Sequence, residues 1–274
     1  NPFMISRLGS LEARFLYNFL VNEKYTRKLN FISHVSPYFK YNYRLLFSMQ
    51  NNAGFFPLNN SNINLFCKRY INDLKNVDIL GCWNGYESKI SSLLSLKYIP
   101  VPLRSIEPFY SKNSWVAALN NKKILVINPF TKSIINQHKK FDKIFDLKFT
   151  DISSYSFKLN VFKPVISNAG NHKTCGYDSW SEALLDMQNQ IKDIDFDIAI
   201  IGAGSYGLPL ASFVKSLGKG SIHLGGSTQI LFGIKGKRWD NHEFISKLYN
   251  ENWVRPDITE IPNNHIKIED GCYW

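Results

Sequence analysis

The apolar positions of this chain follow two spacings. Short β-branched runs are typical of buried strands, and apolar residues three and four positions apart indicate helices. Strands are predicted at Val77 to Cys82, Tyr98 to Leu103, Lys123 to Ile127, Lys143 to Phe145, Asn160 to Val165, Asp197 to Ile201 and Ser221 to Leu224. Helices are predicted at Leu11 to Glu23, Asn62 to Leu74, Tyr86 to Leu94, Trp115 to Leu119, Ser179 to Ile191, Leu208 to Leu217 and His242 to Leu248. The alternation predicts an α/β fold, a Rossmann-like open and mostly parallel sheet with helices on both faces.

Residues 1–274 contain neither an internal repeat nor a low-complexity linker, so a single α/β domain is expected. With 44% hydrophobic and 15% aromatic residues, the chain can bury a substantial core. It does not begin with methionine and could be one domain of a longer polypeptide. Residues 166–178 are predicted to form a long polar loop, and residues 255–274 an irregular segment.

The most distinctive segment contains two glycine turns. The apolar run Asp197 to Ile201 stops at Gly202-Ala-Gly204-Ser-Tyr-Gly207, and helical spacing follows from Leu208 to Leu217. A second short strand then ends at Gly225-Gly226. Glycine turns after two parallel strands bring backbone N–H groups, and in the first turn a helix N-terminus, to one edge of a sheet. That edge suits a phosphate-bearing ligand.

A lone glycine motif of this kind often serves only the tight packing of a helix on a strand. The basic segment Lys235-Gly-Lys237-Arg238 follows close behind, which favours an anionic ligand, although it could equally be a solvated basic turn. A dinucleotide site would place an acidic residue at the end of the second strand, whereas His223 stands there. NAD is therefore less favoured, without being excluded.

A second candidate site opens the chain at Arg7-Leu-Gly9-Ser10-Leu-Glu12, where the first amphipathic helix begins. Ser10 is expected to serve as the N-cap, and Glu12 falls in the first turn, where the helix dipole favours a carboxylate. That role could be purely structural. Alternatively, Glu12 could hold a divalent cation on diphosphate oxygens, and Arg7 could bind phosphate directly.

These two features together resemble the GT-D-type glycosyltransferases, Rossmann-like enzymes that transfer sugars from nucleotide-sugar donors. Their signature is an early R-x-G-D-x-E turn that enters a helix. Arg7, Gly9 and Glu12 match it, and Ser10 stands in place of the aspartate. The resemblance implies donor binding by this turn and metal binding (Mn or Mg) at Glu12, which would act without the second carboxylate.

The glycine turns match the part of the family's donor pocket that lies near the C-terminus, by pattern rather than by identity. The chain is also similar to uncharacterised proteins found with surface-polysaccharide genes, in stretches such as HLGGSTQILFGIKGKRWD. The resemblance implies that the first glycine turn holds the donor diphosphate, that the end of the second strand forms the neighbouring wall and that the basic run stabilises the leaving group. The residues so assigned are Gly202, Gly204, Ser205, Tyr206 and Gly207 for the turn, His223, Gly225 and Gly226 for the wall, and Lys235, Lys237 and Arg238 for the basic run.

An inverting transfer also needs a general base for the acceptor hydroxyl. Besides Glu12, the candidates are Glu107, which follows a predicted strand, and Asp240, which could instead cap the following helix. His172, in the polar loop, could transfer a proton near neutral pH, or its ring could simply form hydrogen bonds within the loop. Trp83 could stack on a sugar or a base, although packing at the end of a strand would explain it as well.

The formal net charge of +11 suits an anionic partner such as a nucleotide, a nucleic acid or an acidic membrane surface. Basic residues are dispersed and no nucleic-acid-binding motif is present, so no specific nucleic acid is expected. The four cysteines show no metal-binding spacing, and neither a signal peptide nor a transmembrane run is found. A cytoplasmic location, with peripheral membrane contact if the acceptor is lipid-linked, is the expectation.

The sequence thus predicts a glycosyltransferase that uses a nucleotide sugar, expected to be UDP-linked, and a polysaccharide, glycoconjugate or lipid-linked glycan acceptor. Two alternatives remain open: a Rossmann enzyme dependent on NAD or S-adenosylmethionine, and a basic nucleic-acid-binding module.

Overall fold

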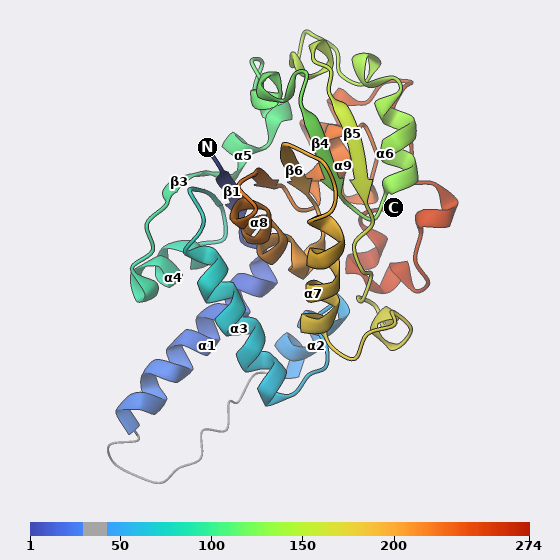
Figure 1. Ribbon diagram of the computed structural model, residues 1–274. Coiled ribbons are helices and arrows are strands. Elements are labelled where there is room, and N and C mark those ends of the chain that lie inside the picture. Colours follow the sequence, from blue (N-terminus) through green and yellow to red (C-terminus); the bar gives the residue numbers. More distant parts are fainter. Residues whose placement is uncertain (30–42) are drawn as a thin grey trace.

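The computed structural model describes residues 1–29 and 43–274. In this part of the chain, seven strands form one sheet in the order β3-β2-β1-β7-β6-β4-β5 (Figure 1). Every pair of neighbouring strands is parallel, which confirms the predicted Rossmann-like α/β fold. The strands are β1 Phe3–Arg7, β2 Ile79–Cys82, β3 Ile99–Pro102, β4 Lys123–Ile127, β5 Lys158–Phe162, β6 Ile198–Ile201 and β7 Gly220–His223.

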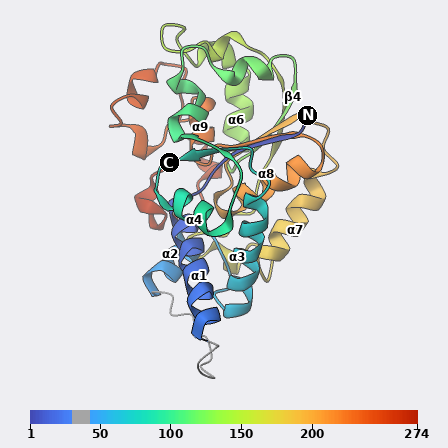
Figure 2. The same ribbon diagram turned by 90° about the vertical axis from the view of Figure 1, so that its left-hand side faces the viewer.

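Helices cover both faces of the sheet, as predicted (Figure 2). The α-helices that pack with the first face are α1 Ser10–Leu29, α2 Tyr43–Asn51, α3 Asn60–Leu74, α4 Tyr86–Leu94, α7 Trp180–Ile191 and α8 Gly207–Ser216. Those on the second face are α5 Leu103–Ile106, α6 Thr131–His138 and α9 Ser227–Leu231. Within the described residues, none of these helices combines the length and apolar character that a membrane span requires.

The central strands show why their sequences are apolar at every position. In β4, Leu125 and Ile127 pack in the core of the first face, and Ile124 and Val126 pack in the core of the second. The side chains of a strand point alternately to opposite faces, so a strand buried on both sides needs apolar residues throughout. The strands β4 and β6 could therefore be predicted from the sequence, because burial on both faces requires an apolar residue at every position.

Other segments differ from the prediction. The strand predicted at Lys143 to Phe145 is wrong, because a 3₁₀ helix at Phe141–Lys143 leads into a turn whose carbonyl group at Ile144 accepts a hydrogen bond from Trp253 Nε1 at 2.7 Å. Its apolar side chains are buried by the loops rather than by strand pairing. The helices predicted from Trp115 and from His242 contain only 3₁₀ turns, Trp115–Leu119 and Ile245–Leu248.

The strand β1 is not among the strands predicted from the sequence, yet it lies in the middle of the sheet. It pairs with β2 on one side and with β7 on the other. The helix α8 connects β6 to β7, so the predicted unit of strand, glycine turn, helix and strand is present. Because the strands are parallel, the end of β1 at Arg7 lies at the same edge of the sheet as the two glycine turns.

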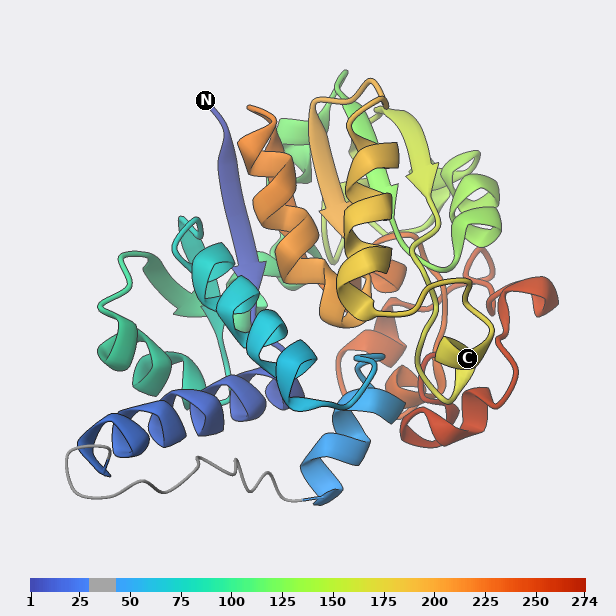
Figure 3. The ribbon, with the colours of Figure 1, turned by 60° about the horizontal axis from the view of Figure 1, so that its bottom comes forward.

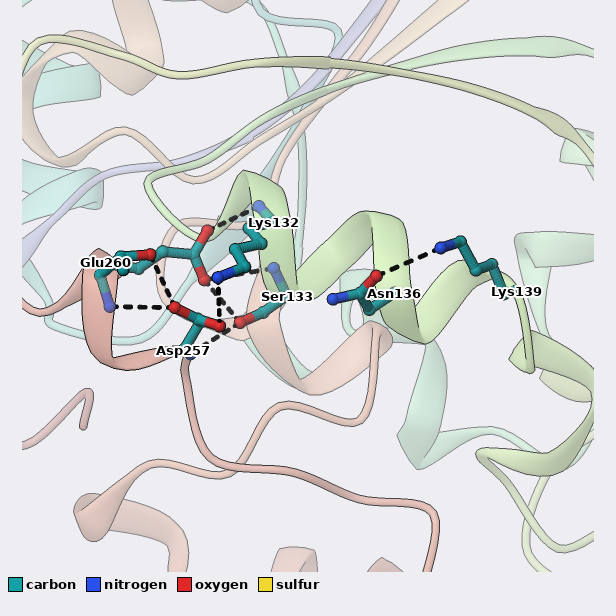
Figure 4. A network of polar contacts seen from close by, with 7 residues as sticks. Lys132, Ser133, Asn136, Lys139, Asp257 and Glu260 are labelled. Atoms are coloured by element: carbon teal, nitrogen blue, oxygen red, sulfur yellow. Dashed lines mark hydrogen bonds and ion pairs between the residues drawn. The ribbon is translucent and has the colours of Figure 1, made fainter.

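The C-terminal segment, residues 255–274, crosses this edge, towards which the strand arrows point (Figure 3). It is anchored on the first turn of α6 by Glu260 (Figure 4). The buried Glu260 carboxylate accepts hydrogen bonds from the backbone N–H groups of Lys132 at 2.6 Å and Ser133 at 3.2 Å, and from the Ser133 hydroxyl at 2.5 Å. Nearby, Lys132 Nζ forms an ion pair with Asp257 at 2.7 Å. Carboxylates are favoured at helix N-termini, so this contact fixes where the segment begins.

We predict that Glu260→Gln lowers the free energy of unfolding by about 2–3 kcal/mol, because the introduced amide replaces a charged acceptor of several hydrogen bonds. Urea unfolding measures the change, and limited proteolysis reports whether residues 255–274 are released. The matched control is Lys132→Ala, which removes only an exposed ion pair worth about 0–1 kcal/mol. Equal losses in the two variants would contradict the anchoring role of Glu260.

Candidate functional site

A cavity of about 280 Å³ opens at the carboxyl edge of the sheet. Its walls come from the ends of β1, β4, β6 and β7, from the loops at residues 52–54 and 164–168, and from the C-terminal segment. The order of the sheet changes direction at β1 and β7, since β2 and β3 lie outward on one side and the later strands on the other. Open α/β sheets bind ligands at the carboxyl ends of strands beside such a change of direction.

The two glycine turns touch each other at Gly202. A Cβ atom at Gly202 would lie 2.5 Å from the Gly225 carbonyl oxygen and 2.7 Å from both Asn128 Nδ2 and Thr228 Oγ1. The Gly225 N–H donates to the Ile201 carbonyl at 3.0 Å. Only glycine therefore allows the turns after β6 and β7 to pack this closely. Both turns line the cavity through Gly202, Gly204, Gly225 and Gly226.

The backbone N–H groups of these turns divide into two sets. Those of Gly202 and Gly225 are used in hydrogen bonds to the ends of β4 and β6. Those of Ala203, Gly204 and Gly226 are not committed to backbone acceptors in the described part of the chain. Gly204 has a φ of +53°, a conformation that glycine adopts readily. The second set is the one that could donate to a ligand.

The other residues of the first turn, Ser205 to Gly207, pack against neighbouring side chains and hold the turn in place. Ser205 is fully buried and does not line the cavity; its Oγ accepts from Trp180 Nε1 at 2.9 Å, and its carbonyl accepts from the Tyr70 hydroxyl at 2.5 Å. Tyr206 lines the cavity and stacks on Trp180 with ring centroids 5.3 Å apart. A Cβ at Gly207 would lie 2.2 Å from His223 Nε2. Ser205 and Gly207 thus have packing roles, whereas the sequence predicted donor contacts for both.

His223 ends β7 and lines the cavity, although it is nearly buried. Its Nδ1 lies 3.1 Å from the Ser6 hydroxyl, on the neighbouring strand β1. Burial, and to a smaller extent the positive charge of the nearby Arg7, lowers the pKa of His223 to about 3. The imidazole is therefore neutral, and a neutral ring ends the strand where a dinucleotide site would have a carboxylate.

Arg7 ends β1 and lines the cavity between the second glycine turn and Trp83. A Cβ at Gly225 would lie 3.4 Å from Arg7 Cδ, and the guanidinium lies 5.0 Å from the centroid of the Trp83 ring. Burial lowers the pKa of Arg7, while the carboxyl groups of Glu107 and Glu12 act in the opposite direction. Among the described residues, no carboxylate forms an ion pair with this guanidinium, so it is available to a bound anion.

Glu12 folds back over the start of its own helix. The Gly9 carbonyl accepts a hydrogen bond from Ala13 N–H at 2.8 Å, so Gly9 is the N-cap and Ser10, predicted to be the cap, is the first helical residue. A Cβ at Gly9 would lie 2.1 Å from Glu12 Oε2, so a side chain at this position would displace the Glu12 carboxylate. Burial raises the pKa of Glu12. The structure thus places Arg7, Gly9, Ser10 and Glu12 together on one cavity wall.

The basic run does not act as one group. Lys235 Nζ lies 5.1 Å from the Tyr249 ring, and Lys237 Nζ donates to the Asp270 carbonyl at 3.3 Å; neither lysine lines the cavity. Arg238 does line it, in an ion pair with Glu269. Of the three basic residues predicted from the sequence, Arg238 alone reaches the ligand space.

Three of the predicted catalytic residues lie outside the cavity lining. Glu107 is buried behind Arg7 and accepts a hydrogen bond from the Ser227 hydroxyl; burial raises its pKa. Asp240 forms an ion pair with Arg255 at 2.6 Å. The ring of His172 stacks on Phe56 with centroids 5.6 Å apart, and burial lowers its pKa. Glu12 is the predicted catalytic residue that reaches the ligand space.

Several lining residues were not predicted. Glu269, Tyr273 and Trp274 come from the C-terminal segment, which was expected to be irregular, and no local pattern marks them as site residues. Neutral polar groups come from loops, from the end of β4 and from α9, namely Asn52, Asn128, Ser167, Asn168 and Gln229. Trp83 was identified from the sequence as a residue that could stack on a sugar or a base. Its side chain is 48% exposed, so its ring is accessible.

The Glu12 carboxylate lines the cavity as a candidate ligand for a divalent cation. In residues 1–29 and 43–274, no group of three or more histidine, cysteine or acidic side chains lies together as a ready metal site. Mg²⁺, however, is often held by one or two carboxylates together with substrate phosphates. The Glu12 carboxylate lines the cavity without an ion pair to any described residue, so it could contribute to such a set.

Comparison with known proteins does not assign a function to this chain. No family model and no curated protein sequence matches the chain. Among solved structures, one described as "The highly conserved domain of unknown function 1792 has a distinct glycosyltransferase fold" is similar over 94% of this chain and 93% of that chain, with 10% identity and a TM-score of 0.40. A likeness this distant does not assign an activity.

The neutral state of His223 predicts a pH dependence of stability. Its pKa of about 3 in the folded protein lies below the ordinary value of 6.5, so the unfolded chain takes up a proton first as the pH falls. Stability is therefore fully present above pH 6.5 and is lost as the pH falls towards 3, by up to about 1.4 kcal/mol per pH unit.

Urea unfolding of the wild type and of His223→Asn at pH 7.5, 6.0 and 5.0 measures this effect. The variant is expected to lose less stability between pH 7.5 and 5.0 than the wild type does, whatever its stability at pH 7.5. The same pH dependence in both proteins would show that His223 is not held neutral.

Proposed function

We propose that this protein is a glycosyltransferase that uses a nucleotide-sugar donor. The observation that carries the proposal is the position of the Arg7 guanidinium, unpaired among the described residues, beside two touching glycine turns at the carboxyl ends of parallel strands. Charged groups that are half-buried without a partner are unfavourable unless a ligand completes them. A diphosphate matches this arrangement in charge and in hydrogen-bond acceptors.

The donor would bind with its diphosphate between Arg7 and the uncommitted N–H groups of Ala203, Gly204 and Gly226. Arg238 also lines the cavity and supplies a second positive charge. The aromatic ring of Trp83 offers an exposed face for a base or a sugar. At about 280 Å³, the cavity is at the small end for ligand sites, so part of the nucleotide would extend out of it.

Glu12 is the proposed catalytic carboxylate, because it shares the cavity wall with Arg7 and its pKa is raised by burial. In an inverting transfer, the acceptor hydroxyl oxygen forms a bond to the anomeric carbon while the bond from that carbon to the diphosphate oxygen breaks. Glu12 takes the hydroxyl proton, and the nucleoside diphosphate leaves with the bonding electrons. Arg7 and Arg238 stabilise the charge that develops on the leaving diphosphate.

A divalent cation bound by Glu12 and the donor phosphates would add to this charge neutralisation. The acceptor is proposed to be a glycan, a glycoconjugate or a lipid-linked glycan. The neutral polar side chains Asn52 and Asn168, which line the same cavity, suit sugar hydroxyls because amides both donate and accept hydrogen bonds.

The first test is calorimetric titration with UDP, GDP and CMP, each with and without Mn²⁺. One nucleotide is expected to bind saturably, and Arg7→Gln is expected to weaken it about ten- to a hundredfold, because a charge-assisted hydrogen bond to phosphate is lost. Arg104→Gln is the matched control, since Arg104 is an exposed arginine close to Glu107 but outside the cavity lining.

NAD and S-adenosylmethionine are titrated alongside the nucleotides. Saturable binding of either, with none of UDP, GDP or CMP, would overturn the proposal in favour of another class of Rossmann enzyme. An equal loss of affinity in Arg7→Gln and Arg104→Gln would show that only the overall positive charge matters, and that Arg7 does not contact the phosphate directly.

The second test concerns Glu12. With the nucleotide sugar whose nucleotide binds, Glu12→Gln is expected to lower the release of nucleoside diphosphate about a hundredfold, because the proton acceptor is lost. Asp240→Asn is the matched control, since that carboxylate is held by Arg255 outside the cavity lining. Unchanged turnover in Glu12→Gln, or an equal loss in Asp240→Asn, would remove Glu12 from the mechanism.

A further inference from the structure

The two arginines of the cavity are in different states. Arg7 is open to the cavity, whereas Arg238, in the 3₁₀ helix Lys237–Trp239, already has an anionic partner. Its Nη2 donates to the Glu269 carboxylate, its Nη1 donates to the Tyr273 hydroxyl at 3.4 Å, and its guanidinium lies 4.7 Å from the centroid of the Tyr273 ring. Arg238 cannot bind a phosphate fully while Glu269 occupies it.

Glu269 is held in this place by an unusual backbone. Glu269, Asp270 and Gly271 have φ values of +46°, +56° and +71° in succession. Positive φ is uncommon for residues other than glycine, and such strained conformations cluster at ligand-binding and switching segments. The strain turns the chain so that the Glu269 side chain lines the cavity beside Arg238.

The backbone around Glu269 is fixed independently of this ion pair. Lys237 N–H donates to the Trp274 carbonyl at 3.1 Å, and Arg238 N–H donates to the Cys272 carbonyl at 3.0 Å. Upstream, Glu260 anchors the same segment on α6. The Glu269 side chain can therefore leave Arg238 by rotation about its own bonds, while the segment stays in place.

A carboxylate and a phosphate present similar oxygen acceptors to a guanidinium. The side chains of Arg238 and Glu269 are 37% and 38% exposed, and ion pairs this exposed are weak. A bound phosphate can thus compete with Glu269. Glu12 and Glu269 line the same cavity, and the Glu269 charge adds to the effect of burial in raising the pKa of Glu12.

We propose that Glu269 is a built-in competitor that occupies the phosphate position on Arg238 until a diphosphate displaces it. This inference rests on the proposed nucleotide-sugar function and adds a source of selectivity to it. A single phosphate is satisfied by Arg7, which is already open. A diphosphate gains a second arginine by displacing Glu269, so Glu269 lowers affinity for diphosphates more than for monophosphates.

Calorimetric titration with inorganic pyrophosphate and orthophosphate tests the proposal on the wild type, Glu269→Gln, Asp270→Asn and the double variant Arg238→Gln/Glu269→Gln. Glu269→Gln is expected to bind pyrophosphate about fivefold more tightly, the equivalent of about 1 kcal/mol, and orthophosphate with less than about a twofold change. Asp270→Asn removes the same charge one residue further along without touching Arg238, and its affinity is expected to change less than about twofold. The double variant is expected to lose the gain. Thermal unfolding verifies that each variant is folded.

Weaker or unchanged pyrophosphate binding in Glu269→Gln would overturn the proposal, since Glu269 would then support Arg238 or be irrelevant to it. An equal gain in Asp270→Asn would overturn it in favour of general charge, and a gain kept in the double variant would show that Arg238 is not involved. If neither the wild type nor any of the three variants binds pyrophosphate, the proposed nucleotide-sugar function itself fails.

Discussion

The structure of the site depends on the contact between two glycine turns at the ends of β6 and β7. No side chain fits at Gly202, because the Gly225 carbonyl, Asn128 and Thr228 already surround its Cα. This close approach lets the second turn lie against Arg7, at the end of the neighbouring strand β1. A similar constraint holds at Gly207, where the ring of His223 fills the space of a side chain. The glycines thus bring three strand ends together and leave backbone N–H groups beside a cation.

The charges of the cavity follow from this arrangement. Arg7 and Arg238 face the same space as Glu12 and Glu269, with Glu107 buried behind Arg7. One arginine is paired with a carboxylate from the C-terminal segment, and the other is open to the cavity. A site with one open and one occupied arginine is suited to an anion that extends over both, which is the chemical character of a diphosphate.

The C-terminal segment completes a site that begins at the N-terminus. Glu260 fixes it on α6, and backbone hydrogen bonds to residues 237 and 238 fix its end, so that Tyr273 packs against Gly226 and Arg238. More than 250 residues separate Glu12 from Glu269, yet both line one cavity. The Glu12 and Glu269 carboxylates are therefore close enough to interact only when the chain is folded.

The sequence by itself determined most strands of the sheet and the edge at which the cavity opens. The strands β4, β6 and β7 and the helices α4, α7 and α8 were predicted to within a residue or two, because strands buried on both faces must be apolar throughout and the glycine turns mark where they stop. The Arg7 to Glu12 turn was predicted as a candidate site because an arginine and a glutamate flank a glycine where a helix begins. The tertiary structure alone decided which charged residues line the cavity. Lys235, Lys237, Asp240 and Glu107 carry suitable chemistry in sequence, but their side chains are directed to other partners or lie behind the wall. Glu269 and Tyr273, by contrast, are placed in the cavity by long-range packing that leaves no local pattern.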